Sequence, residues 1–480
     1  MRIMAEKKFL DKILFFFFLF IVLQELSLIG YLYPLWNKIF FCLFLALTIF
    51  LTYKNQNYGW LILLFELFAG HGGQLFSWMI SLRLAIFIIV FGFWLFRKVQ
   101  GLFIKKRQFQ FSGASAPAFI LLFFLIFIFF GLIQGLINNN VHLAIGDFIN
   151  YSYWFLIFPL FEFFKEKENQ KNFLALFIGC LFGLSFLTLI IFIFFSQGIV
   201  EVHDVFYWWW RNIATGKATA MNDNFFRIVT PAHLLIPSIF LLLISLYSQK
   251  KYRKWTIPLM VALSFPFLVN FSRIYWLGFL IGLLVLGLRK PIKKNLKISF
   301  LIFILLVLEF GVIYFLTSKG QSFGLDFFGD RLKTTVNPEE ELSALTRLRI
   351  LPNLLENIAE YPIFGRGLGA EVSYFDPVEN NLKTTYHLDW GFLEMWLELG
   401  FLGLISFFLV LGEIFYLLIK SRKENKEKEI FFWGLITGVL SLLISSLTGP
   451  FIFHSLGVIY LVLVFIYGVR CCPNSDLSKS

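Results

Sequence analysis

The chain has 480 residues, of which 58% are hydrophobic and 15% are charged, and its formal net charge is +12. Repeated apolar runs of 17 residues or more, such as Ile13 to Ile29, are typical of membrane-spanning helices and exclude a water-soluble enzyme. In a bilayer each backbone amide must be paired within its own segment, so the runs predict an all-α polytopic membrane protein. The basic residues lie in short clusters between these runs rather than on one domain, which argues against nucleic acid as a partner.

Reading the apolar runs in chain order predicts about 12–14 transmembrane helices. They lie near residues 13–31, 36–53, 58–70, 76–96, 117–137, 146–164, 172–195, 229–247, 255–270, 274–288, 298–317, 388–419, 430–447 and 451–468. The run 58–70 is short for a span and is also compatible with a re-entrant segment. The sequence from Asn270 to Arg273 interrupts an otherwise continuous run, and we expect a helical hairpin there.

The basic clusters predict the topology. With a cytoplasmic N-terminus they all fall on the inside, which is the positive-inside pattern of a multi-pass protein of the bacterial inner membrane. These clusters lie at residues 97–107, 165–171, 250–254, 289–297 and 420–428. The first apolar run has no small-residue cleavage site after it, so we read it as an uncleaved span. The short outside loops hold few cations, and Arg227 and Arg273 therefore need a reason to be there.

A long polar stretch from Ser318 to Tyr386 separates two groups of spans. We expect an integrated protein made of a helical bundle (1–317), a large periplasmic loop (318–387) and C-terminal helices (388–480). Leucines at helical spacing between Leu345 and Ile358 predict a helix in the loop. The glycine-rich turn that follows is only weak evidence for phosphate binding, because no strand precedes it. The four cysteines give neither a disulfide framework nor a metal-ligand spacing, so we expect no metal and no cofactor.

Several short motifs of the C-terminal half occur in a characteristic order. They are Ser272-Arg273, Arg347, the turn Pro362-Ile363-Phe364-Gly365-Arg366-Gly367-Leu368-Gly369, His387, and the run from Leu393 to Leu404. Together they resemble the O-antigen ligase and O-antigen polymerase family over about residues 265–410. Leu388 stands where that family usually has an asparagine after the histidine.

The resemblance implies a type C glycosyltransferase-like fold and a metal-independent membrane glycosyltransferase of polysaccharide or lipopolysaccharide biosynthesis. Such an enzyme transfers a glycan from undecaprenyl diphosphate to an acceptor sugar hydroxyl at the periplasmic face of the cell envelope. The acceptor is a lipid-anchored core for a ligase and a growing repeat unit for a polymerase, and the sequence leaves this choice open. The implied partners are the lipid-linked donor, the acceptor and membrane lipids.

The resemblance also implies roles for individual residues. His387 is the catalytic candidate, because an imidazole that titrates near neutrality suits removal of the acceptor proton. Arg273 and Arg227 are the candidates for binding the diphosphate, whose developing charge calls for arginine forks.

Five further residues are supporting candidates, each with a structural alternative. Arg347 and Arg366 either line the diphosphate pocket or solvate the loop. Asp389 either caps a helix or orients the imidazole. Glu394 and Glu398 follow His387 on one helical face, where they line a polar cavity or form structural pairs. Glu66, Arg83 and Glu309 are intramembrane charges for which the sequence suggests no role.

Two other classes of function compete with the enzyme. A transporter or flippase of lipid-linked oligosaccharide also needs outside arginines, but it should hold its key charges near mid-bilayer in related halves. A membrane scaffold or sensor would explain the long loop but not the outside arginines.

Overall fold

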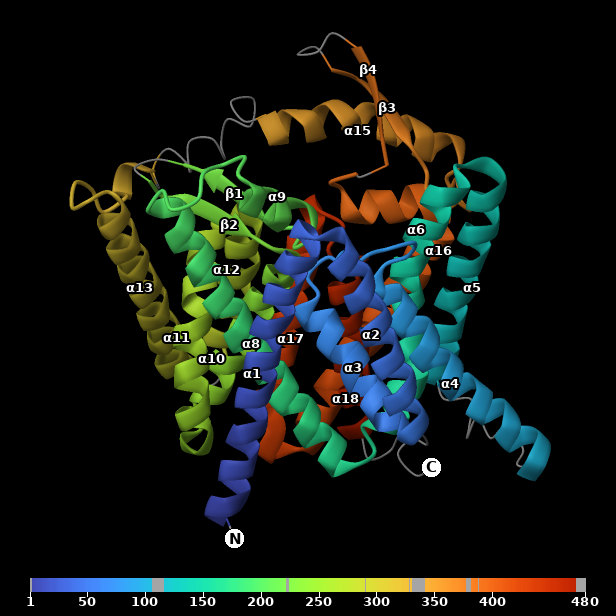
Figure 1. Ribbon diagram of the computed structural model, residues 1–480, viewed down its shortest axis with the longest axis horizontal. Helices are drawn as coiled ribbons and strands as arrows, with labels where there is room; N and C mark the ends of the chain where they lie inside the picture. The colour runs from blue at the N-terminus through green and yellow to red at the C-terminus, as the bar shows by residue number, and fades with distance from the viewer. Residues whose placement is uncertain are drawn as a thin grey trace. The chain divides into compact units, whose positions relative to one another are not determined.

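The computed structural model describes residues 2–105, 116–221, 224–289, 291–327, 329, 342–376, 381–386 and 388–471. Within these ranges the chain is mostly helical, which confirms the predicted fold class (Figure 1). The strands form two antiparallel pairs, β1 (Lys217–Ala220) with β2 (Phe226–Val229) and β3 (Val372–Asp376) with β4 (Asn381–Thr385). In the second pair Ser373 lies opposite Thr384.

Each of the predicted apolar runs contains a helix. The helices of the N-terminal half are α1 (Arg2–Leu32), α2 (Pro34–Lys54), α3 (Gln56–Ala69), α4 (Leu82–Lys105), α5 (Ala116–Asn138), α6 (Val141–Ser152), α7 (Ile157–Phe163), α8 (Lys167–Ser196), α9 (Val205–Asn212) and α10 (Ile236–Tyr247). Those of the C-terminal half are α11 (Arg253–Asn270), α12 (Arg273–Gly287), α13 (Ile292–Thr317), α15 (Leu342–Glu360), α16 (Gly391–Glu424), α17 (Glu429–Ser445) and α18 (Ser455–Cys471). Short 3₁₀ turns join several of them, among them Tyr153–Leu156 between α6 and α7.

Eight helical segments of the described chain are long and apolar enough to cross a membrane, and three shorter apolar helices accompany them. The protein is therefore a multi-pass membrane protein. The predicted break between residues 270 and 273 is confirmed, because α11 ends at Asn270 and Phe271 has the left-handed backbone angles φ 46° and ψ 37°. The predicted helix 76–96 begins later, at Leu82, because residues 70–81 form turns.

The chain divides into two compact units. The first comprises Met1–Gln110, Ile157–Ser272 and Phe300–Phe323, and the second comprises Phe111–Leu156, Arg273–Ser299 and Gly324–Ser480. In the first unit α1 packs along α8, where Gly179 and Gly183 let the two helices approach. A Cβ on Gly179 would lie 2.8 Å from the carbonyl oxygen of Ile13, so the contact depends on small residues.

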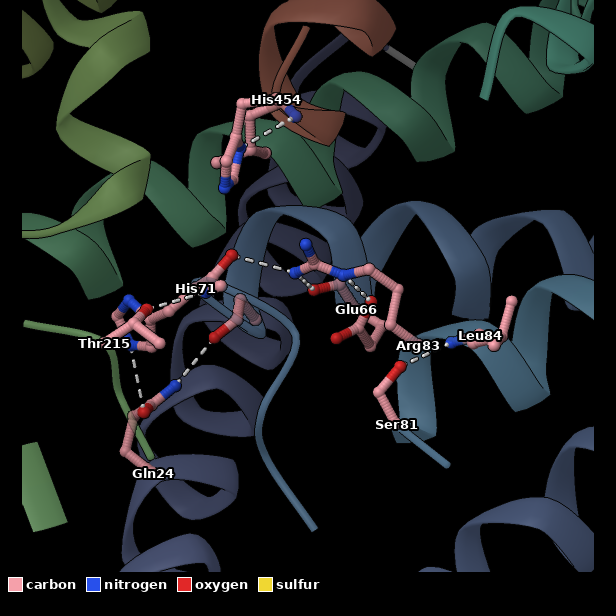
Figure 2. Close-up of polar contacts among 11 residues, drawn as sticks. Gln24, Glu66, His71, Ser81, Arg83, Leu84, Thr215 and His454 are labelled. Atoms are coloured by element: carbon pink, nitrogen blue, oxygen red, sulfur yellow. Dashed lines mark hydrogen bonds and ion pairs between the residues drawn. The ribbon is translucent and has the colours of Figure 1, made fainter. Parts of the chain in front are cut away.

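A buried polar network holds the turn between α3 and α4 in the first unit (Figure 2). Arg83 Nε donates to Glu66 Oε2 at 2.7 Å, and Arg83 Nη2 donates to the carbonyl of His71 at 2.9 Å. The His71 ring nitrogen Nε2 lies 3.1 Å from Oε1 of Gln24, whose amide donates to the carbonyl of Ala69. Glu66 and Arg83 are each 4% exposed, so each charge is stabilised by the other. Two of the three charges for which the sequence suggests no role, Glu66 and Arg83, thus form a structural ion pair.

Two apolar surfaces organise the second unit. Helix α12 packs on α17, where a Cβ on Gly278 would lie 2.7 Å from the Ser441 carbonyl oxygen. The loop helix α15 confirms the predicted helix, and it packs beside the β3–β4 hairpin (Figure 1). Its buried stripe consists of Ile350, Leu354 and Ile358, whereas Leu348 and Leu355 are exposed. The stripe packs against residues of β3 and against Leu388 and Leu397, which fixes the loop to the start of α16.

We expect Arg83→Met to lower the free energy of unfolding by about 3–5 kcal/mol, because it leaves the buried carboxylate of Glu66 without its partner. The double variant Glu66→Met/Arg83→Met should recover most of this loss. Thermal unfolding of the detergent-solubilised protein measures both. A single variant as stable as the natural chain would contradict the structural role of the pair.

The buried histidine should make stability depend on pH. Burial, followed by the charge of Arg83, lowers the pKa of His71 from 6.5 to about 3. Below pH 6.5 His71 binds a proton in the unfolded chain but not in the folded chain. The free energy of unfolding therefore falls as the pH drops toward 3, by up to about 1.4 kcal/mol per pH unit. His71→Asn, which tolerates the positive φ of 50° at this position, should remove that slope. Equal differences in melting temperature between pH 7 and pH 5 for the two proteins would refute this.

Candidate functional site

The sequence-predicted site residues are divided between the two units. Arg227 belongs to the first unit, and the others that are described belong to the second. His387 lies outside the described residues, so its predicted role as catalytic base stays a prediction. The residues that adjoin it in the chain are described: Tyr386 is 37% exposed, and Leu388 is 1% exposed and packs in the core beneath α15.

Helix α16 is broken at Gly400. This residue has φ 72° and ψ 178°, which are not helical angles, so the residues before and after it form two helical segments. A break inside an apolar helix frees backbone groups that must find partners. The segment from Pro362 to Gly369, which we call the glycine turn, supplies them.

Backbone hydrogen bonds join the glycine turn to both sides of the break. The amides of Arg366 and Gly367 donate to the carbonyls of Leu397 and Glu398 at 2.7 and 3.0 Å. In the other direction, the amides of Phe401 and Leu402 donate to the carbonyls of Pro362 and Ile363 at 2.9 and 3.2 Å. The turn therefore completes the broken helix.

The three glycines of the turn are required by close backbone contacts. Gly365, Gly367 and Gly369 have φ values of 74°, 97° and 73°, which side-chain-bearing residues rarely adopt. A Cβ on Gly365 would lie 2.5 Å from the carbonyl oxygen of Glu398, and a Cβ on Gly367 would collide with the backbone of Gly135 in α5. These contacts explain the glycine pattern without a ligand.

The amides of Gly365 to Gly369 are directed at protein acceptors. Leu368 donates to the carbonyl of Gly131 at 2.9 Å, and Gly369 donates to Asp147 Oδ2 at 2.9 Å and to Glu398 Oε1 at 3.2 Å. Arg366 and Gly367 donate to α16, as described above. These hydrogen bonds favour a structural role for the turn over phosphate binding by its amides.

Glu398 belongs to a buried cluster of polar groups. It is 4% exposed and accepts the Gly369 amide and a 3.4 Å hydrogen bond from the hydroxyl of Tyr151. Asp147 accepts the same Gly369 amide. Of the two sequence-based alternatives for Glu398, this geometry favours the structural one.

Sequence reasoning missed Asp147 and Tyr151. Asp147 lies in the apolar run 146–164, whose one other acidic residue is Glu162, and an acidic residue in such a run is a signal that was available. Glu394 lies one helical turn before Glu398 and is near enough to Asp147 and Asp389 for their charges to interact. It therefore links the buried cluster to the start of α16.

Two arginines and one aspartate meet at the start of α16. Arg347 Nε donates to Asp389 Oδ2 at 3.0 Å, and the indole of Trp390 donates to the carbonyl of Arg347 at 3.1 Å. Arg273, the first residue of α12, is near enough to Arg347 for their like charges to interact. Asp389 does not cap α16, because Trp390 holds the N-cap position. Asp389, the anion of this cluster, lies two residues after His387 in the chain.

The remaining predicted arginines have local hydrogen bonds. Arg366 Nη1 donates to Asn357 Oδ1 at 2.7 Å and to the carbonyl of Glu371 at 3.2 Å, so it stabilises the loop. Arg227 Nε donates at 2.8 Å to the carbonyl of Asn270, the last residue of α11. Among the residues that the structure describes, no group of three or more His, Cys, Asp or Glu side chains is arranged to hold a metal ion.

The comparison with protein families matches this part of the chain. Residues 258–408 match the model of the family described as O-antigen ligase, whereas no curated protein and no solved structure matches. The matched region contains Arg273, Arg347, the glycine turn and the break in α16, and it agrees with the region in which the sequence resemblance was recognised. The protein is thus a multi-pass membrane protein in which residues 258–408 match the family described as O-antigen ligase.

Proposed function

We propose that the protein is a metal-independent membrane glycosyltransferase. It transfers a glycan from undecaprenyl diphosphate to an acceptor sugar hydroxyl at the periplasmic face of the bacterial inner membrane. The observation that carries the proposal is the meeting of Arg273, Arg347 and Asp389 within the matched family region. Guanidinium groups suit an anionic leaving group, because they donate charge-assisted hydrogen bonds to phosphate oxygens.

The charges of Arg273, Arg347 and Asp389 suit the following reaction. The acceptor oxygen attacks the anomeric carbon and forms the new glycosidic bond, while the bond from that carbon to the diphosphate oxygen breaks. The diphosphate leaves with the electron pair, and Arg273 and Arg347 stabilise the charge that develops on it. The imidazole of His387 takes the proton of the acceptor hydroxyl. Asp389 holds Arg347 at the start of α16, next to the histidine in the chain.

Arg227 enters the proposal as a further cation toward the diphosphate. Its hydrogen bond to Asn270 ties it to the end of α11, three residues before Arg273 in the chain. The proposed orientation, with the N-terminus cytoplasmic and the loop periplasmic, rests on the basic clusters that precede and follow the apolar helices.

The break in α16 bears on the transporter alternative. Transporters use broken helices to bind substrates with the freed backbone groups. Here the glycine turn takes up the backbone groups on both sides of Gly400, and its own amides are directed at the protein. The break therefore supports a rigid positioning role rather than a substrate pathway.

Deletion of the gene, followed by gels of the lipid-linked and surface glycans, tests the proposal. Single repeat units that accumulate on the lipid carrier would identify a polymerase, and full-length chains stranded there would identify a ligase. We expect the natural chain to restore the profile, and His387→Ala and Arg273→Ala to reduce transfer at least about 100-fold at unchanged protein level. The exposed His142 provides a matched control, since His142→Ala should restore it fully.

An unchanged glycan profile after deletion of the gene would refute the proposed glycosyltransferase activity. Normal transfer by a well-expressed His387→Ala variant would leave the enzyme in place but refute the assigned base.

A charge exchange separates the two roles of Arg347. If Arg347 stabilises the leaving diphosphate, both Arg347→Ala and the exchanged pair Arg347→Asp/Asp389→Arg should lower the transfer rate about 100-fold or more. An ion pair that only fixes the loop would instead be restored by the exchange. Initial rates at saturating donor decide, and recovery of the natural rate by the exchanged pair would remove Arg347 from the diphosphate site.

A further inference from the structure

A polar hollow of about 450 Å³ lies in the second unit, separate from the arginine cluster described above. We call it the α15 pocket. One wall is a face of α15, formed by Asn353, Glu356, Asn357 and Glu360. These residues follow one another at intervals of three, one and three, so they share one side of the helix. Buried Ile350, Leu354 and Ile358 belong to the opposite, apolar stripe.

The other walls come from the end of the glycine turn and from the hairpin. Arg366 and Glu371 line the pocket on one side, and Ser373 of β3 and Thr384 of β4 line it on the other. Ser373 and Thr384 are register partners whose hydroxyl oxygens lie 2.9 Å apart. All the lining side chains are therefore polar, which excludes a lipid tail as the occupant.

Hydrogen bonds between the walls hold the pocket in shape. Asn353 Nδ2 donates to the carbonyl of Ser373 at 2.6 Å and thereby joins α15 to β3. Arg366 Nη1 donates to Asn357 Oδ1 and to the carbonyl of Glu371, which joins α15 to the glycine turn. A preorganised site avoids the cost of ordering its side chains when a ligand binds.

The charges of the pocket select the class of ligand. Glu356, Glu360 and Glu371 contribute three carboxylates against the one guanidinium of Arg366, so the diphosphate and other anions are disfavoured. In the part of the chain that the structure describes, these three carboxylates form no ion pair. Carboxylates, amide oxygens and hydroxyls accept hydrogen bonds, and a ligand rich in hydroxyl donors complements them.

The position of the pocket relates it to the arginine cluster. Arg347 and Asn357 are ten residues apart on the same helix, which corresponds to about 15 Å along the axis. The volume falls in the range of small-ligand sites, about 300–1,000 Å³. A short chain of sugars that starts at the reacting centre is long enough to enter the α15 pocket, and its hydroxyl groups can donate to the acceptors there.

We propose that the α15 pocket binds a short neutral or amine-bearing oligosaccharide, namely sugars of a glycan substrate that lie beyond its reacting sugar. This inference rests on the proposed glycosyl transfer. The same chemistry has two sources, the distal sugars of the lipid-linked donor and those of the acceptor. The pocket sets which glycans are accepted, whereas Arg273 and Arg347 bind the diphosphate common to all donors.

Binding by the purified full chain tests the pocket independently of catalysis. The probe is the cell's own repeat-unit oligosaccharide, released from its lipid, and the measurement is isothermal titration calorimetry in detergent. We expect Glu356→Gln/Glu360→Gln/Glu371→Gln to weaken binding at least tenfold, with Glu201→Gln, an exposed glutamate of the first unit, as the matched control. Inorganic diphosphate should not compete. Equal affinity of the natural and triple-variant proteins, or competition by diphosphate, would overturn the proposal.

Transfer kinetics identify the source of the sugars. If the donor fills the pocket, the triple variant should raise KM at least tenfold for a donor carrying a full repeat unit, but not for one carrying a single sugar. If the acceptor fills it, the same split should occur between long and short acceptors. An unchanged KM for all four substrates would refute oligosaccharide binding by the α15 pocket without contradicting the proposed glycosyl transfer. Oligosaccharide binding without any transfer would refute the proposed glycosyl transfer without contradicting oligosaccharide binding by the pocket.

Discussion

The constraint on which the second unit depends is that a backbone group in an apolar helix cannot remain without a partner. Helix α16 breaks at Gly400, and the carbonyls and amides released there are bound by the glycine turn. One segment therefore acts at once as the completion of a helix and as the anchor of the polar loop. Because the hydrogen bonds across the break join backbone to backbone, they depend on how closely the two segments approach, and glycine at positions 365, 367 and 369 permits that approach.

The anchored loop determines where charges can lie. The glycine turn fixes one end of α15, and the apolar stripe at Ile350, Leu354 and Ile358 fixes its side against the start of α16. Arg347 is thereby held at Asp389, while the opposite, polar face of α15 forms the wall of a separate pocket. A single amphipathic helix thus separates a cationic group from an anionic one, and the two groups suit chemically different parts of one glycan donor.

The sequence predicted the helices well because a membrane-spanning helix requires an apolar run of sufficient length, and such a run can be read from contiguous residues. It also located the break before Arg273 and the helix in the loop, because asparagine, proline and the spacing of leucines are signals that lie within a few neighbouring residues. The partners of Glu66 and Glu398 were out of reach because they come from other elements: Arg83 follows a turn of twelve residues, and Asp147 precedes Glu398 by about 250 residues. The backbone partners of the glycine turn were out of reach for the same reason, because they come from other elements that are distant in sequence.

The carboxyl cluster beneath the loop adds a last step to the argument. Asp147 and Glu398 both accept the one amide of Gly369, and two ionised carboxylates so close together in an apolar setting would repel each other strongly. One proton on the pair lowers its joint charge from −2 to −1, and carboxyl oxygens of both residues still accept the Gly369 amide. Glu394, whose charge interacts with those of Asp147 and Asp389, connects this pair electrostatically to the start of α16. The positive field of Arg273 and Arg347 is therefore opposed less when the pair carries one negative charge than when it carries two.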